Sequence, residues 1–244
     1  MRTGASARVG AALLVVLSAA ADTPPDQSWL AWQLVDSAFP TGGFAHSGGL
    51  EAAWQQGEIR SGTDAAAFIQ YGLKQIGRGS LPFVLAAFQD PARLIELEEW
   101  YDSFTSNHVA NRASRLQGRA FWNGVLNTFL SRDQEVLSSM PAHPLLYHLP
   151  PLFGALAKRL ALEKKAAARM FLFLHLRGWI SSAIRLGVTG PMEGQRIQRG
   201  LSAEAEGILS RCLDLPLEDA AQVAPLIELW QGCQDRLYSR LFQS

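Results

Sequence analysis

The sequence is short of cysteine and has no excess of either charge. Its two cysteines, Cys212 and Cys233, lie outside any Cys-x-x-Cys spacing and make neither a disulfide framework nor a zinc site by themselves. The 22 Lys and Arg residues balance the 22 Asp and Glu residues, so no net field attracts nucleic acid or an acidic membrane. We therefore expect two buried thiols, no nucleic-acid partner and no membrane partner.

The sequence also lacks the short motifs that bind nucleotides or zinc. It contains no Gly-x-x-x-x-Gly-Lys-Ser/Thr phosphate loop, no Gly-x-Gly-x-x-Gly turn and no His-Glu-x-x-His pair. Its histidines are scattered, and a single histidine in an apolar helix is more often a packed side chain than a metal ligand. We therefore expect no directly bound cofactor. The histidines are His46, His108, His143, His148 and His175.

One pentapeptide, residues 45–49, resembles the nucleophile elbow of a serine hydrolase, with Ser47 as the nucleophile. An elbow needs a preceding strand, yet Pro40 and paired glycines come before it, and no segment shows convincing strand alternation. We therefore predict no catalytic residue and expect Ser47 to cap the helix that begins near Leu50, with Glu51 in its first turn. A hydrolase using Ser47 stays the alternative.

Helical periodicity runs through most of the chain. With 244 residues, 48% of them hydrophobic, the sequence can bury one large core. Residues 164–187 form the most apolar long stretch and should be the central buried helix, because Arg169, Arg177 and Arg185 interrupt it too often for a membrane span. The sequence predicts an all-α, single-domain bundle of roughly eight to ten helices over residues 26–244. A helical interaction domain of unassigned role is the least specific interpretation.

Local signals place the other helices. Ser61 with Asp64 has the spacing of a capping box, and Pro91 suits a first helical turn. Pro141, Pro144 and Pro150 are expected in a linker between two helices. The remaining helices are predicted at residues 68–76, 94–104, 109–130, 151–162, 193–199, 203–213 and 218–231.

The N-terminal residues differ from the rest of the chain. Arg2 and Arg8 precede an apolar run, residues 11–21, that ends in small residues. This pattern is typical of a cleavable signal peptide and is too short for a transmembrane helix. A start-site error or a disordered Ala-rich stretch explains it equally well. We therefore treat residues 1–25 as a leader-like or disordered extension.

Two segments are more specific than a helical core requires. Residues 39–51 contain four glycines, which allow unusual backbone angles or close backbone contact. In residues 185–195, Gly187 is expected to end a helix, Pro191 to begin the next one and Glu193 to interact favourably with its dipole. A tight connection between packed helices would explain both segments without any function.

Together with residues 238–244, these segments resemble the urease accessory protein family UreF, in the same order along the chain. The resemblance covers residues 29–244, and residues 111–119 and 148–154 carry weaker similarity. The first segment is similar to the family pattern at Pro40, Gly42, Phe44, Ser47, Gly49, Leu50 and Glu51, the second at Arg185, Leu186, Gly187, Gly190, Gly194 and Gln195.

Two positions depart from the family pattern. Pro191 stands where many members have Gln, and Gln234 stands where a His often precedes the tail. Nickel contact through these two positions is therefore not expected.

The resemblance implies an all-α homodimer that is not an enzyme. It would join a UreH/UreD protein, the GTPase UreG and apo-urease during nickel insertion and would modulate the GTPase. Nickel and GTP would be handled by the complex, and residence would be cytoplasmic despite the leader-like N-terminus. The C-terminal residues would dock into the UreH/UreD partner, with Arg240 as a geometric anchor. The predicted partner-binding residues are Pro40, Gly42, Phe44, Ser47, Glu51, Arg185, Gly190, Glu193, Gln195, Tyr238, Arg240, Leu241 and Phe242.

Overall fold

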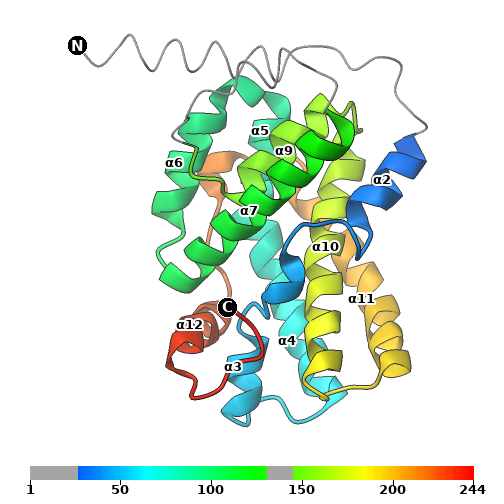
Figure 1. The fold of residues 1–244 in the computed structure, drawn as a ribbon, viewed down its shortest axis with the longest axis vertical. Coiled ribbons are helices and arrows are strands. Elements are labelled where there is room, and N and C mark those ends of the chain that lie inside the picture. Colours follow the sequence, from blue (N-terminus) through cyan, green and yellow to red (C-terminus); the bar gives the residue numbers. More distant parts are fainter. Residues whose placement is uncertain (1–26, 131–144) are drawn as a thin grey trace.

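The computed structural model describes residues 27–130 and 145–244, so the extension of residues 1–25, Pro141, His143 and Pro144 lie outside the described residues. The described chain is helical and contains no strand, which confirms the predicted all-α class (Figure 1). None of its helices is both long and apolar enough to cross a membrane. The α-helices are α2 (Gln27–Val35), α3 (Leu50–Gln55), α4 (Gly62–Gln75), α5 (Leu81–Gln89), α6 (Leu94–Phe104), α7 (His108–Phe129), α9 (Leu149–Arg159), α10 (Lys164–Arg185), α11 (Pro191–Cys212) and α12 (Pro225–Cys233).

Short helical turns connect several of these helices. A π-helical segment continues α4 into α5, and the other turns are 3₁₀ helices at connections. The π-helical segment is η2 (Ile76–Ser80). The 3₁₀ helices are η1 (Gly43–Ala45), η3 (Pro91–Arg93), η4 (Leu217–Asp219) and η5 (Gln234–Arg236).

The core is built around α5, α9 and α10. Helix α9 lies so close to α5 that a Cβ atom on Gly154 would come within 2.0 Å of the Val84 carbonyl oxygen. Phe153 stacks on Phe121 and packs against Phe171, with ring centroids 5.2 and 5.3 Å away. Helix α10 contacts α2, α4, α5, α9 and α11 and buries residues along its whole length. The predicted central helix is confirmed, although α9 is buried along nearly its entire length as well.

Buried polar side chains fix the start of α9. Glu98 on α6 accepts the N–H groups of Leu146 and His148, at 2.9 and 2.8 Å. The His148 ring lies 3.2 Å from Ser114 Oγ through Nδ1 and 2.9 Å from Asp102 Oδ1 through Nε2. Burial raises the pKa of Glu98 to about 7 and lowers the pKa of His148. These bonds satisfy polar groups that would otherwise be buried without partners.

Most helix boundaries follow the local signals in the sequence. The Ser61 side chain accepts the Asp64 N–H at 3.2 Å and caps α4, as the capping-box spacing predicts. Pro91 begins η3, which runs directly into α6. Pro150, in contrast, does not lie in the linker but in the first turn of α9, a position that suits proline. Gly187 follows α10 with a positive φ of 72°, which is the backbone geometry expected of a glycine that ends a helix.

Two predictions in the C-terminal third are wrong. Residues 193–199 and 203–213 belong to one helix, α11, because α11 packs on α10 and α4 and its Gly200 is tolerated within the helix. Residues 218–231 do not form one helix either. Helix α12 begins only at Pro225, whose ring suits a first turn but would break a helix that had started earlier.

Candidate protein-docking site

The glycine-rich loop before α3 is pressed between α10 and α12. Gly48 and Gly49 have positive φ angles of 59° and 90°. A Cβ atom on Gly48 would lie 2.6 Å from Trp179 Nε1, and one on Gly49 would lie 2.9 Å from the backbone nitrogen of Gln231. Both the backbone angle and the space therefore require glycine, which explains this part of the sequence pattern.

The C-terminal tail, residues 238–244, ends alongside this loop. The Ser47 N–H donates to the Ser244 carbonyl oxygen at 2.5 Å, and the Gln243 N–H donates to the Ala45 carbonyl oxygen at 2.8 Å. Residues almost two hundred positions apart in sequence are thus joined main chain to main chain. This pairing holds the end of the tail in an extended path beside the loop.

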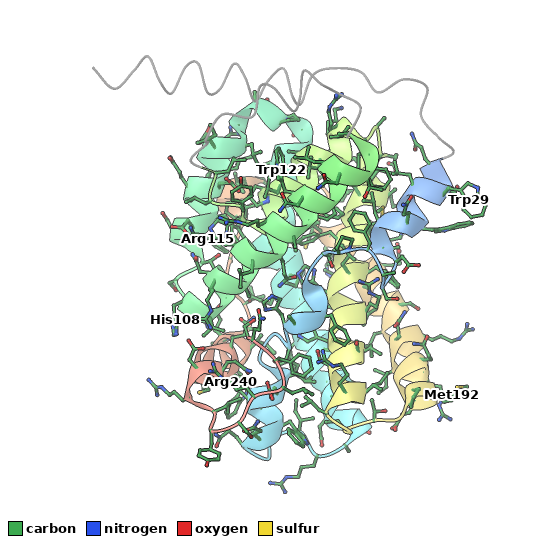
Figure 2. The ribbon with its side chains drawn as sticks, viewed as in Figure 1. Trp29, His108, Arg115, Trp122, Met192 and Arg240 are labelled. Atoms are coloured by element: carbon green, nitrogen blue, oxygen red, sulfur yellow. The ribbon has the colours of Figure 1, made fainter. Side chains whose placement is uncertain are left out.

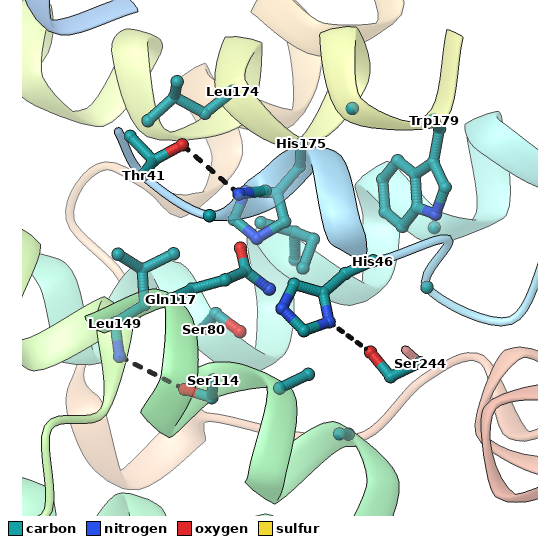
Figure 3. Close-up of a pocket in the computed structure, with 18 of the residues that line it drawn as sticks. Thr41, His46, Ser80, Ser114, Gln117, Leu149, Leu174, His175, Trp179 and Ser244 are labelled. Atoms are coloured by element: carbon teal, nitrogen blue, oxygen red, sulfur yellow. Dashed lines mark hydrogen bonds between the residues drawn. The ribbon is translucent and has the colours of Figure 1, made fainter. Parts of the chain in front are cut away.

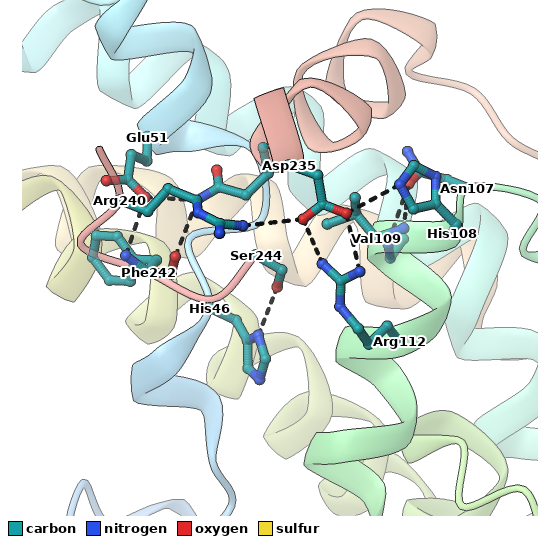
Figure 4. Close-up of polar contacts among 12 residues, drawn as sticks. His46, Glu51, Asn107, His108, Val109, Arg112, Asp235, Arg240, Phe242 and Ser244 are labelled. Atoms are coloured by element: carbon teal, nitrogen blue, oxygen red, sulfur yellow. Dashed lines mark hydrogen bonds and ion pairs between the residues drawn. The ribbon is translucent and has the colours of Figure 1, made fainter. Parts of the chain in front are cut away.

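His46 adds a side-chain bond to the same pairing. Its Nδ1 atom lies 2.6 Å from the Ser244 hydroxyl (Figure 4). Burial, assisted by the positive charge of Arg112, lowers the pKa of His46 to about 4. The imidazole is therefore neutral near pH 7, and a neutral ring can share a hydrogen bond with a hydroxyl inside the protein without the cost of a buried charge.

Glu51, in the first turn of α3, holds the tail backbone. Its buried carboxylate accepts the N–H of Leu241 at 2.6 Å and the N–H of Phe242 at 3.1 Å. It also accepts from the Gln234 side-chain amide at 2.7 Å, and this amide donates to the Phe242 carbonyl oxygen as well. One acidic side chain thus joins α3, η5 and the tail. Gln234, the departure from the family pattern, is a buried hydrogen-bond donor here.

Arg185, at the end of α10, is enclosed by two aromatic rings. Its guanidinium carbon lies 3.7 Å from the ring centroid of Phe44 and 4.3 Å from that of Phe242. The guanidinium also donates to the Phe44 carbonyl oxygen. Phe242 is buried, whereas the Phe44 ring is largely exposed. The stacking fixes the tail ring in place and presents the Phe44 ring at the surface.

Asp235 connects the segment before the tail to α7. It accepts two hydrogen bonds from Arg112, at 3.0 and 2.8 Å, and lies 3.2 Å from His108 Nε2 and 3.3 Å from Arg240 (Figure 4). The hydrogen bond from Arg112 is the main cause that lowers the pKa of Asp235. Exposed ion pairs contribute little stability each, so this network orients the tail more than it stabilises the fold.

A cavity of about 350 Å³ lies behind the loop, and nothing in the sequence pattern predicted it. Figure 3 shows His46, Gln117 and His175 around it, with Trp179 to one side. His175 Nδ1 lies 2.9 Å from the Phe171 carbonyl oxygen, and burial lowers its pKa. Both imidazoles are therefore neutral near pH 7, and Arg177 and Glu228 also line the cavity. No group of three His, Cys, Asp or Glu side chains in the described ranges could hold a metal ion.

The structure gives Ser47 the surroundings of a structural residue. It is fully buried, its hydroxyl accepts the Glu51 N–H at 3.4 Å, and the residue at the cap position itself is Gly49. The predicted capping role is therefore displaced by two residues, because Gly49 adopts the left-handed angle that starts α3. The turn before Ser47 is η1, a 3₁₀ helix, where a nucleophile elbow requires a strand.

Comparison with known proteins identifies the family of this chain. The family model UreF matches residues 59–202. The chain belongs to the UreF family. Urease accessory protein F of Arabidopsis thaliana is 33% identical over 229 residues, which cover 88% of this chain and 92% of the relative. The protein of the same name from Oryza sativa subsp. indica is 32% identical over 219 residues, covering 88% and 84%. A Schizosaccharomyces pombe protein named as UreF-like is 28% identical, covering 86% and 94%.

The resemblance to UreF is thus confirmed, and the relatives are named as urease accessory proteins. In this UreF chain, the first sequence segment, the tail and Arg185 meet at one place. The sequence order gave no indication that they would be neighbours.

The predicted partner-binding residues of this UreF chain differ in exposure. Ser47, Glu51 and Phe242 are buried and hold the tail from inside. Tyr238 is fully exposed and Leu241 is 52% exposed, so their side chains are open to another protein. Contact with a partner stays a prediction for all of these residues. Phe44, Arg185 and Arg240 also lie around the tail at or near the surface. Pro40 is exposed and its ring lies against Gly124 of α7, and Gly42 forms the turn before η1 with a φ of 69°.

The rest of the second segment lies elsewhere. Glu193 and Gln195 belong to the first turns of α11, and the Glu193 carboxylate lies against Gly62 at the start of α4. Gly190 caps α11 with an extended backbone. Figure 2 places Met192, in the same turn, on the opposite side of the molecule from Arg240. Arg185 alone among the predicted residues of that segment reaches the tail.

Proposed function

We propose that this UreF chain is a non-catalytic scaffold of urease maturation. It works in the cytoplasm as a homodimer, joins a UreH/UreD-like protein, a UreG-like GTPase and apo-urease, and modulates the GTPase. Nickel and GTP are handled by the other members of that complex. The chain belongs to a family whose named relatives are urease accessory proteins, and this membership supports a role in urease maturation.

The tail is the observation that carries the docking part of the proposal. Its backbone is held by Glu51 and by the glycine-rich loop, yet the side chains of Tyr238 and Leu241 point away from those contacts and remain open. The exposed Leu241 side chain stands on a backbone that Glu51 holds, so covering it by a partner costs little backbone entropy. An exposed tyrosine such as Tyr238 is a frequent anchor at protein interfaces. Helix α12, next to the tail in Figure 1, also exposes two apolar side chains, Leu226 and Leu229.

Co-purification tests this proposal. The double variant Tyr238→Ala with Leu241→Ala should fold normally, because both side chains are exposed, and should retain a UreH/UreD-like protein at least about tenfold less well, as expected for loss of two anchors. Tyr71→Ala removes another exposed tyrosine, on α4 and 59% exposed, and serves as the control. Undiminished co-purification of the double variant with both the UreH/UreD-like protein and the GTPase would remove the tail from the docking surface.

A further inference from the structure

Helix α7 carries charge of one sign only. Its 22 residues include no Asp or Glu, although the chain as a whole is neutral. Arg112, Arg115 and Arg119 follow one another at spacings of three and four residues, so their side chains lie on one face of the helix, and all three are exposed. We refer to these three residues as the α7 basic face. In Figure 1, α7 crosses the front of the molecule in green.

Two arginines of this face are held in place but keep unused hydrogen-bond donors. Arg115 Nε donates to the Leu146 carbonyl oxygen at 3.1 Å, and the guanidinium carbon of Arg119 lies 4.8 Å from the ring centroid of Tyr147. Within the described ranges, the terminal nitrogens of Arg115 and all the nitrogens of Arg119 make no hydrogen bond or ion pair. Side chains that are already positioned lose little rotamer freedom when another group binds them.

The acids nearest to this face have other partners. Asp235 accepts two hydrogen bonds from Arg112. Asp102 of α6 bonds to the histidine at the start of α9, and the buried carboxylate of Glu98 accepts backbone N–H groups of the same segment. Arg115 attracts Asp102 and Glu98 only through its charge, at longer range. The donors of the α7 basic face are therefore available to an acid from outside the chain.

We propose that the α7 basic face docks an acidic segment of a protein partner. Arg115 and Arg119 are four residues apart, so about 6 Å of helix axis separates them. Carboxylates on neighbouring turns of a partner helix have the same spacing, and each can accept two parallel N–H groups from one guanidinium. Leu116, which is 46% exposed beside Arg115, adds an apolar contact. The inference goes beyond the proposed function and does not depend on it, because the tail takes no part.

The charges around this face favour separate carboxylates over a continuous polyanion. The side chains of Asp102 and Asp235 lie beside it and are 39% and 30% exposed. A nucleic-acid strand or an anionic membrane carries negative charge along its whole length and would meet both acids, and the neutral chain has no net field to offset that repulsion. A protein segment can place its carboxylates opposite Arg115 and Arg119 alone.

Binding of a fluorescently labelled poly-L-glutamate peptide to the full-length chain tests the proposal. Its affinity is measured by fluorescence anisotropy at low salt. The double variant Arg115→Gln with Arg119→Gln should bind at least about fivefold more weakly, as expected for the loss of two exposed charge pairs. Arg196→Gln with Arg199→Gln removes the same charge from exposed positions on α11 and is the matched control, which should bind like the wild type.

A second variant guards against a folding defect. Leu116→Glu keeps both arginines and their contacts with the segment before α9, and its added negative charge should also weaken binding of the peptide. Thermal unfolding checks that every variant is folded. Unchanged affinity of the α7 variants, equal weakening by the two arginine pairs, or no binding of the peptide by the wild type overturns the proposal.

Two other anions distinguish the class of partner. Heparin and phosphatidylglycerol vesicles are tested against the same variants. If either binds through Arg115 and Arg119 while poly-L-glutamate does not bind, the face belongs to another polyanion and the proposal is overturned. These mixtures contain no urease protein, so their outcome leaves the co-purification test of the tail untouched, and the reverse also holds.

Discussion

At the scale of single residues, the sequence shows the position of Glu51 but not the contacts that it makes. The sequence places an acid in the first turn of a helix, which its dipole alone would explain. The structure uses the same carboxylate to accept two tail N–H groups and one side-chain amide. Local spacing explains the helix position, while the three donors come from residues about 180 to 190 positions further along the chain.

Glu51→Gln should therefore destabilise the protein. An amide at this position presents an NH₂ donor to groups that are themselves donors, so at least one buried N–H loses its acceptor. We expect a loss of roughly 2–3 kcal/mol in the free energy of unfolding, measured by urea denaturation. Glu58→Gln, at an exposed position just after α3, is the control and should change little. Equal stability of the two variants would contradict the role given to Glu51.

His46 predicts a dependence of stability on pH. Its pKa falls from 6.5 to about 4 in the folded chain, mainly because of burial. The folded state therefore binds this proton less readily than the unfolded state, and the contribution of neutral His46 is present above pH 6.5 and lost as the pH falls towards 4. A difference of about 2.5 pKa units corresponds to about 3 kcal/mol.

The variant His46→Gln should flatten this part of the curve when urea denaturation is followed between pH 4 and 7. His108→Gln is the matched control, because the side chain of His108 is 68% exposed. Glu98, whose pKa is raised to about 7, acts in the opposite direction, since its protonated form favours the folded state as the pH falls. The contribution of His46 is therefore measured by the difference in the free energy of unfolding between wild type and His46→Gln. A difference that does not change with pH would contradict the predicted role of His46.

At the scale of helices, periodicity and caps predict two of the long helices well. The helix predicted at residues 109–130 is α7, His108–Phe129, and the one predicted at 164–187 is α10, Lys164–Arg185. Both begin with a side chain that accepts backbone N–H groups, Asn107 for α7 and Glu163 for α10. Helix α11 was wrongly divided because the stabilising contacts with α10 and α4 are tertiary and leave no local signal.

Close approaches between helices are equally hard to predict. A Cβ atom on Gly118 of α7 would lie 1.9 Å from the Tyr147 carbonyl oxygen, in the segment that leads into α9. Tyr147 itself has a positive φ of 65°, which is strained for a tyrosine. In the sequence, a glycine inside a helix only lowers the predicted helix stability. In the fold, the missing side chain of Gly118 makes room for the backbone at Tyr147.

Gly118→Ala and Gly200→Ala should thus change stability in opposite directions. At Gly118 the new methyl group meets backbone that cannot move without disturbing the start of α9, and we expect a loss of about 1–3 kcal/mol or more. At Gly200, within α11, a Cβ atom would meet nothing within 4 Å, and alanine should gain about 0.5–1 kcal/mol through helix propensity. Thermal and urea unfolding measure both. Stabilisation by both substitutions would show that the segment before α9 is free to move.

At the scale of the whole molecule, the sequence identified the segments shared with the family but did not show that they lie together in the fold. Residues 39–51, Arg185 and the tail come together because α10 carries Arg185 back to the loop and α12 returns the chain beside α3. Gly190, Glu193 and Gln195 lie at the far end of the α10–α11 connection. The cavity behind His46 also depends on the packing of several helices, which no single segment encodes.

This arrangement divides the molecule into two units, a closely packed core and the tail, residues 238–244. The tail is joined to the loop and to α3 by a few hydrogen bonds and by the packing of Phe242 on Arg185, whereas the loop and α3 bury Phe39, Leu50 and Ala53 in the core. Units with few buried apolar contacts open at lower free energy than the core does. Phe242→Ala should therefore speed amide hydrogen exchange of Ser47 and Gln243, whose N–H groups bond across the loop and the tail.

The same variant should leave exchange in α5 and α9 unchanged. The residues that hold Phe242 are Glu51, Gln234 and Arg185, and none of them lies in α5 or α9. Tyr238→Ala, which removes a fully exposed ring from the same tail, is the control and should leave both units unchanged. Faster exchange in α5 and α9 would mean that the tail stabilises the whole fold. No change in the exchange rate of Ser47 would mean that the loop keeps its shape without the tail.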